Sequence, residues 1–132
     1  MKKITILIAD DNKKLIEGLL FIFTVHAHLE VIGQVFNGQQ AIEHYSNLKP
    51  DIVIMDINME PVNGFDACRI ITKNYPEAKI IGFSVKNITA YADIMMQNGA
   101  KGFVSKTAPP SELVKAIEKV HEGGNYVGSD II

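Results

Sequence analysis

The chain has 132 residues, of which 47% are apolar, and it carries a formal net charge of −2 and a single cysteine. This length and apolar content are typical of one domain with one hydrophobic core, and they exclude a disordered tail. Because lysine and arginine are scattered and in no excess, we do not expect the chain to bind nucleic acid directly. One cysteine excludes an internal disulfide framework and fits a reducing cytosol.

The N-terminal sequence MKKITILIADD has the basic start of a signal peptide but not its apolar length. Two aspartates end the apolar run after about six residues, which is too short for a secretion signal. No run approaches the roughly 18 apolar residues that a membrane span needs. The sequence therefore predicts a cytoplasmic protein with no membrane association.

Short apolar runs rich in β-branched residues predict the strands of the domain. In chain order they are Ile4–Ala9, Val31–Val35, Ile52–Met55, Lys79–Phe83 and Gly102–Ser105. The segment after each run has apolar residues at helical spacing, marked in turn by Leu15, Leu19 and Ile22; Ala41, Ile42 and Tyr45; Phe65, Cys68 and Ile71 or Thr72; Tyr91, Ile94 and Met95; and Leu113, Ile117 and Val120.

Strand alternating with helix five times predicts an α/β fold of the (βα)5 type, with a doubly wound five-stranded parallel sheet in a single domain. Strands covered by helices on both faces also explain why runs such as Ile52–Met55 are apolar without interruption. We expect residues 1–123 to form this domain. Residues 124–132 are predicted to begin a linker, without a fold of its own, toward an output domain that is not present in this chain.

The segment Leu15–Val25, LIEGLLFIFTV, is more apolar than one buried helix face requires. Either the first helix is deeply covered by the rest of the domain, or it has a face for self-association.

Chemically active side chains follow four of the predicted strands. Asp10 and Asp11 follow the first strand, Asp56 the third, Ser84 the fourth and Lys106 the fifth. In open parallel sheets, ligands bind beyond the carboxyl ends of the strands, where the strand order reverses. If the order is 2-1-3-4-5, as in flavodoxin-like folds, the three aspartates converge on one pocket with the hydroxyl and the ammonium beside it.

Three carboxylates in one pocket repel one another, and a hard divalent cation relieves this repulsion. Mg²⁺ takes carboxylate oxygens and keeps several of its waters, and Mn²⁺ can take its place. A metal, a spare carboxylate, a hydroxyl and an ammonium are the groups that phosphoryl transfer to a carboxylate requires. One alternative is that Asp10 and Asp11 only cap the first helix, but a cap needs one acidic residue and leaves Asp56 and Lys106 unexplained.

Four segments together resemble the receiver domain of two-component response regulators. They are LIADDN, VIMDINM, GFSVKN and AKGFVSK, each at the end of its own predicted strand, and the resemblance covers residues 3–122. It implies the strand order 2-1-3-4-5. The later segment SKTAPPSELVKAI and the Gly-Gly-Asn-Tyr ending resemble the NarL/FixJ/LuxR-type subgroup, which carries a C-terminal helix-turn-helix output domain.

The resemblance implies that Asp56 is the phosphoacceptor, taking a phosphoryl group from a phosphohistidine of a sensor histidine kinase or from a small phosphodonor. Asp11, Asp56 and the backbone carbonyl of Asn58 would bind Mg²⁺ directly, and Asp10 would act mainly through a water. Lys106 would pair with Asp56 at rest and with a phosphoryl oxygen after transfer.

The resemblance also implies a switch. Ser84 would bond a phosphoryl oxygen, Phe103 would move into the space that Ser84 leaves, and the surface of the fourth helix, fifth strand and fifth helix would change. Phosphorylation would then favour a homodimer and control a transcription regulator, with DNA contacted only through the missing output domain. The domain would be no enzyme beyond catalysing its own phosphorylation and dephosphorylation. The alternative is a stand-alone single-domain receiver that acts through protein contacts.

The sequence departs from the family pattern around the site. Thr107 follows the lysine where the family often has a proline in a cis peptide, Phe103 stands where tyrosine is common, and Val85 is bulkier than the usual alanine. Glu60 occupies the place where many relatives have proline, and Pro61 comes one residue later. We expect Glu60 to affect metal affinity or the choice of kinase rather than the chemistry.

Three other functions fit the sequence less well. A phosphatase of the haloacid dehalogenase type needs a second aspartate two residues after its nucleophile, where this chain has Asn58. A flavodoxin-like cofactor binder needs a hydroxyl-rich phosphate loop after the first strand, where this chain has ADDNKK. A degenerate receiver acting as a constitutive binding module would not need the full set of acidic, hydroxyl and lysine positions.

Overall fold

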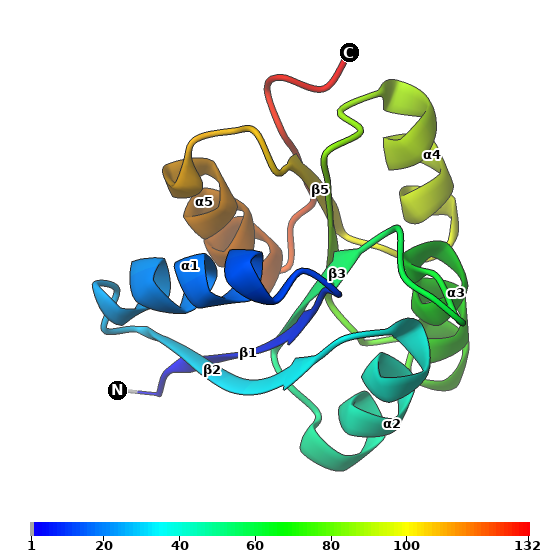
Figure 1. Cartoon of the computed structure of the whole chain (residues 1–132), viewed down its shortest axis with the longest axis horizontal. Coiled ribbons are helices and arrows are strands. Elements are labelled where there is room, and N and C mark those ends of the chain that lie inside the picture. The colour runs from blue at the N-terminus through cyan, green and yellow to red at the C-terminus, as the bar shows by residue number, and fades with distance from the viewer. Residues whose placement is uncertain (1) are drawn as a thin grey trace.

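The computed structural model describes residues 2–132, which form one parallel sheet with helices on both faces (Figure 1). The strands are β1 (Ile4–Ala9), β2 (Leu29–Val35), β3 (Ile52–Asp56), β4 (Ile80–Ser84), β5 (Gly102–Ser105) and β6 (Tyr126–Val127). The helices are α1 (Lys13–Thr24), α2 (Gly38–Leu48), α3 (Gly64–Asn74), α4 (Thr89–Gln97) and α5 (Pro110–His121). None of the helices in this described part has the length and hydropathy of a membrane span.

The sheet order is β2-β1-β3-β4-β5-β6, and all neighbouring strands are parallel. The predicted doubly wound α/β fold and the order 2-1-3-4-5 of its first five strands are therefore confirmed. The prediction of only five strands is wrong, because β6 pairs with β5 at the edge of the sheet. This strand lies in residues 124–132, where we expected a linker without a fold of its own. That these residues lead toward an output domain stays a prediction.

Each face of the sheet carries its own apolar core. Ile6 and Ile8 pack with residues of α1 and α5, whereas Leu7 and Ala9 pack with residues of α2, α3 and α4. Figure 1 shows the same division, with α1 and α5 on one side of the sheet and α2, α3 and α4 on the other. Burial on both faces is the reason why the strands are apolar at successive positions.

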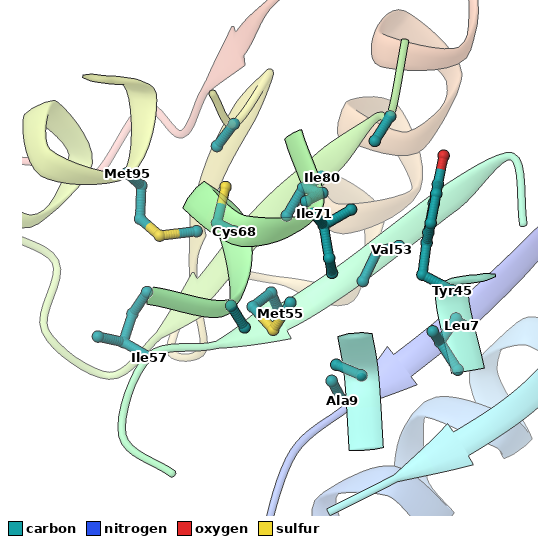
Figure 2. Close-up of a cluster of buried hydrophobic side chains, with 14 of the residues drawn as sticks. Leu7, Ala9, Tyr45, Val53, Met55, Ile57, Cys68, Ile71, Ile80 and Met95 are labelled. Carbon is teal, nitrogen blue, oxygen red and sulfur yellow. The ribbon is translucent and has the colours of Figure 1, made fainter. Parts of the chain in front are cut away.

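The lone cysteine, Cys68, lies in the core formed with α2, α3 and α4 (Figure 2). Its thiol is fully buried, and burial raises the pKa of that thiol to about 12. A thiol that stays protonated is a poor nucleophile, so Cys68 serves as a small packing residue.

Three helices begin at an asparagine cap. The side chains of Asn12, Asn37 and Asn63 each accept a hydrogen bond from the backbone N–H three residues further on. Because Asn12 caps α1, the acidic pair Asp10 and Asp11 is not used as the cap. Both aspartates stay in the loop at the carboxyl end of β1.

Helix α1 is covered on one face only. Ile16, Leu19 and Phe23 are buried, but Phe21 and Val25 are 70% and 73% exposed. The alternative of a deeply covered first helix is therefore wrong. Phe21 and Val25, the residue that directly follows α1, are four residues apart and leave an apolar strip at the surface.

Gly64 begins α3 against the carboxyl end of β3. A Cβ atom at this position would overlap the carbonyl oxygen of Asp56 and lie 2.9 Å from the Cα of Ile57. The Gly64 N–H donates to the Ile57 carbonyl at 2.8 Å, which fixes this close approach. A residue with a side chain would push the helix away from the strand that carries Asp56.

We expect Gly64→Ala to lower the free energy of unfolding by about 3 kcal/mol, because the new methyl group must displace backbone atoms. Gly18→Ala is the matched control, since a Cβ atom at Gly18 in α1 would meet nothing within 4 Å. We expect this control to raise stability by about 0.5–1 kcal/mol, as alanine is the better helix former. Urea unfolding measures both changes, and equal effects of the two substitutions would contradict the close approach at Gly64.

Candidate functional site

The residues predicted to form the site meet at the carboxyl edge of the sheet. Asp56 ends β3, Ser84 ends β4, and Asp10 and Lys106 directly follow β1 and β5. Because β1 pairs with β3, the acidic loop after β1 lies beside Asp56. Carboxylate oxygens of Asp10, Asp11 and Asp56 all lie within 4.8 Å of one another. The sequence prediction that the three aspartates converge is borne out by this geometry.

Lys106 bridges the two buried carboxylates of the site. Its Nζ lies 2.7 Å from Oδ2 of Asp10 and 3.1 Å from Oδ1 of Asp56, and its side chain is 12% exposed. The expected contact with Asp56 is present, and the contact with Asp10 is an addition. In a largely dehydrated setting, such a shared ammonium stabilises both carboxylates more strongly than a surface ion pair would.

Asp56 is 3% exposed, and its Oδ1 accepts a hydrogen bond from the Ile57 N–H at 2.9 Å. Burial raises the pKa of the Asp56 carboxyl, and the neighbouring Asp10 carboxylate raises it further. Lys106 and the Ile57 N–H lower the pKa without offsetting the rise. The ionised form of Asp56 is therefore under-stabilised by the protein alone.

The donor set fits a hard divalent cation. Three carboxylates face one ammonium, so the pocket keeps an excess of negative charge that Mg²⁺ would balance. Asp11 is exposed, and it lines an open cavity of about 400 Å³ together with Asn58, Met59, Glu60 and Asn63. Asn58, the predicted backbone ligand, and Glu60, the predicted modulator, are thus next to the acidic pocket.

Ser84 is buried, and its Oγ accepts a hydrogen bond from the Lys86 N–H at 3.0 Å. The Ser84 carbonyl accepts from the Lys106 N–H at 2.8 Å, so the serine and the lysine are joined through the backbone. Val85, between Ser84 and Lys86, is exposed. The hydroxyl is therefore held by the loop that follows β4.

Phe103 is fully buried in the core formed with α2, α3 and α4. It pairs with Gly82 of β4, and a Cβ atom on Gly82 would lie 2.8 Å from the Phe103 ring. The missing side chain on β4 gives the ring the space it occupies. Phe103 is therefore next to the strand that ends in Ser84.

The sequence interpretation missed a pair of hydroxyl groups that flank the lysine. Ser105 Oγ accepts from the Thr107 N–H at 3.1 Å and lies 2.7 Å from Thr107 Oγ1. The Ala108 N–H donates to the Ser105 carbonyl at 3.2 Å, which closes a turn around Lys106. In residues 2–132 the one cis peptide joins Glu60 and Pro61, so the peptide after the lysine is trans. A hydroxyl residue on each side of Lys106 was the sequence signal for such a turn.

Residues 6–118 match the family model for the response regulator receiver domain. The fold, the acidic pocket and this match together define the class of protein: the chain belongs to the receiver domain family of two-component response regulators.

Curated relatives include transcription regulators and a chemotaxis protein. The chain is 33% identical over 125 residues to the transcriptional regulatory protein DegU of Brevibacillus brevis, covering 95% of this chain and 53% of that protein. It is 44% identical over 115 residues to the chemotaxis protein CheY of Thermotoga maritima, covering 87% of this chain and 95% of that protein. The chain spans about half the length of the transcription regulators that it matches.

A solved structure with the same fold is a two-component response regulator of the LuxR family from Aurantimonas sp. SI85-9A1. The TM-score is 0.94 at 29% sequence identity, over 98% of this chain and 93% of that chain. The resemblance to NarL/FixJ/LuxR-type regulators that was read from the sequence is confirmed.

We expect Asp56→Asn to raise the free energy of unfolding at neutral pH by about 1 kcal/mol, a common size for one stabilising substitution. The folded-state pKa of Asp56 lies above its ordinary value of 3.8, so the folded chain binds more protons than the unfolded chain between these two values. The destabilisation that the ionised Asp56 carboxylate causes in the folded state is therefore complete above the folded-state pKa. It decreases as the pH falls toward 3.8.

Urea unfolding at several pH values measures this difference, with Asp93→Asn on the exposed side of α4 as the control. The gain from Asp56→Asn should shrink as the pH falls, whereas the control should show no such trend. A loss of stability in Asp56→Asn at neutral pH would contradict the electrostatic account of the site.

Proposed function

We propose that this chain is a phosphoacceptor domain in which Asp56 takes a phosphoryl group from a phosphohistidine of a sensor histidine kinase, or from a small phosphodonor. The observation that supports this most is the buried Asp56 carboxylate beside an ammonium at 3.1 Å, at the open edge of the sheet. A carboxylate oxygen attacks phosphorus, the phosphorus–nitrogen bond breaks, and the departing imidazole keeps the electron pair and takes up a proton.

The side chains around Asp56 have distinct parts in this transfer. Lys106 balances the charge on a phosphoryl oxygen, and it is already placed between Asp10 and Asp56. Mg²⁺, or Mn²⁺ in its place, would be held by Asp11, Asp56 and the backbone carbonyl of Asn58, with Asp10 acting through a water, and would supply positive charge to the phosphoryl oxygens. Asp56, being poorly solvated, is an available nucleophile.

The phosphoryl group then acts as a switch. It adds roughly −1.5 to −2 charges and three strong acceptors at Asp56. Ser84 Oγ turns to donate to one of these oxygens, and the buried Phe103 ring moves into the space that the serine leaves. The surface of α4, β5 and α5 changes as a result. Two or three charge-assisted hydrogen bonds supply the few kcal/mol that such a population shift needs.

We propose that this switch controls a transcription regulator through a DNA-binding output domain beyond the receiver. Similarity to transcription regulators about twice as long as this chain supports that role. The alternative is a stand-alone receiver acting through protein contacts, which is favoured by similarity to a chemotaxis protein of nearly the same length. In both cases the domain catalyses only its own phosphorylation and dephosphorylation and acts on no other substrate. A cytoplasmic location stays a prediction.

Labelling by acetyl phosphate with Mg²⁺, followed by the mass of the intact protein and of its peptides, tests the function. We expect labelling at Asp56, none in Asp56→Asn, and wild-type labelling in the exposed control Asp93→Asn. We expect Lys106→Ala to slow labelling by about 100-fold or more, the usual cost of losing one charge-stabilising donor. Equal labelling of Asp56→Asn and the wild type would overturn the proposal.

We further propose that phosphorylation favours a homodimer through the exposed strip at the end of α1, formed by Phe21 and the capping residue Val25. Both side chains are more than two-thirds exposed, which is unusual for apolar groups without a partner. We expect the molar mass of the wild type to rise on labelling, and that of Phe21→Glu to stay at the monomer value with unchanged labelling. Leu48→Glu, an exposed leucine on α2, is the control. A phosphorylated Phe21→Glu dimer as tight as that of the wild type would exclude this face.

A further inference from the structure

The segment after α5 returns across the edge of the sheet to the start of α4. Its first part, β6, pairs in parallel with β5, so that Tyr126 faces Gly102 and Val127 faces Phe103. The Gly128 N–H then donates to the Phe103 carbonyl at 2.9 Å. Figure 1 shows this red segment leaving β5 and ending near the top of α4.

The end of this segment is bonded to the loop between β4 and α4. The Ile132 N–H donates to the Asn87 carbonyl at 2.9 Å, and the Thr89 N–H donates to the Ile132 carbonyl at 2.7 Å. The Asn87 side-chain Nδ2 donates to the Asp130 carbonyl at 3.1 Å. Since Ile88 gives α4 no side-chain cap, the Ile132 carbonyl satisfies an N–H group that the helix start leaves open.

Two further contacts hold the segment in place. Ser129 donates from its N–H and its Oγ to the two carboxylate oxygens of Glu112, at 2.8 and 3.1 Å. Ile131 packs against the core that contains Phe103. The segment 126–132 is therefore bonded to the backbone of Phe103 and packs against the apolar core to which the Phe103 ring belongs.

The same short loop is held at its other end by the proposed switch residue. Ser84 Oγ accepts from the Lys86 N–H, and Asn87 is the next residue along the chain. If the hydroxyl turns toward Asp56, the Lys86 N–H loses its acceptor and the loop is free to shift. A shift of Asn87 breaks its hydrogen bonds to the Asp130 carbonyl and to the Ile132 N–H. Ser84 and the returning segment are thus linked through a single loop.

We propose that residues 126–132 act as an internal strap, which holds the β4–α4 loop in the arrangement where Ser84 is bonded to Lys86 and which phosphorylation of Asp56 releases. This proposal rests on the proposed function. Coupling between two sites is reciprocal, so weakening the strap must also favour the phosphorylated form. The competing explanation is that β6 only covers the edge of the sheet, in which case the strap would not respond to the site.

Hydrogen exchange of the whole chain, with and without acetyl phosphate and Mg²⁺, tests the release. We expect the amides of residues 128–132 to exchange about 5-fold faster or more after labelling, the lower range of typical coupling between sites. The Asp56→Asn variant, given the same reagents, should show no change. Unchanged exchange in a labelled wild type would overturn the strap and leave the phosphoacceptor function standing.

The reciprocal effect is measured with variants of the strap contacts. We expect Asn87→Ala to increase the labelled fraction at limiting acetyl phosphate by about 5-fold. Ser129→Ala, which removes only one hydroxyl contact to Glu112, should give a smaller increase in a fully folded chain. Asn47→Ala, an exposed asparagine near the end of α2, is the matched control and should label like the wild type.

The outcomes separate the two proposals. Labelling of Asn87→Ala and Ser129→Ala at the wild-type level would contradict the coupling without touching the phosphoacceptor function. A wild type that takes no label at Asp56 would overturn the phosphoacceptor function, and the strap would fall with it.

Discussion

Asp56 is a buried carboxylate beside a second buried carboxylate, and the shared contact with Lys106 is the interaction on which the site depends. Without the lysine, two like charges would face each other in a dehydrated setting, and one of them would take up a proton. With it, the raised pKa of Asp56 shows that the compensation is still incomplete. The pocket therefore keeps an excess of negative charge, which a divalent cation can balance.

This electrostatic arrangement requires a backbone that holds the site residues in fixed positions. The cap at Asn12 starts α1 after the acidic pair, so that Asp10 and Asp11 stay on the loop. Gly64 lets α3 begin in contact with the carbonyl of Asp56, which fixes the far side of the same strand end. The Asn12 N–H also donates to Oδ1 of Asp10 at 2.9 Å. Both residues decide where the carboxylates point, since packed backbone elements move only at a large cost.

The parts predictable from the sequence were those set by local pattern. Continuous apolar runs such as Ile52–Met55 identified strands buried on both faces, and polar residues at their ends identified the site. The apolar pattern predicts the orientation of α4 less well: of its marking residues Tyr91, Ile94 and Met95, Met95 is buried but Ile94 is 40% exposed. A short helix at one side of the sheet buries few residues, so the pattern of large apolar residues did not determine its orientation.

The parts that could not be predicted depend on contacts between distant segments. Strand β6 has two residues, too few for any periodicity, and it forms because β5 offers an unpaired edge. The ion pair of Lys106 with Asp10 depends on the spatial position of β1 relative to β5, which no local spacing records. The resemblance to receiver domains supplied the strand order, whereas the Gly-Gly-Asn-Tyr ending after α5 indicated a subgroup and not a position in the sheet.

Two serines in register show how a fixed group and a movable group can share one edge of the sheet. Ser84 and Ser105 end neighbouring strands, and each hydroxyl accepts from the backbone N–H two residues further on. Ser105 has a second hydroxyl partner in Thr107 and lies in a closed turn, so the backbone of Lys106 is held in place. Among residues 2–132 the Ser84 hydroxyl is bonded only to the Lys86 N–H, in the loop that begins with the exposed Val85, so fewer bonds oppose a change of its partner. The difference in the number of bonds, rather than in residue type, supports the proposed roles of the lysine as the constant element and of the serine as the element that responds.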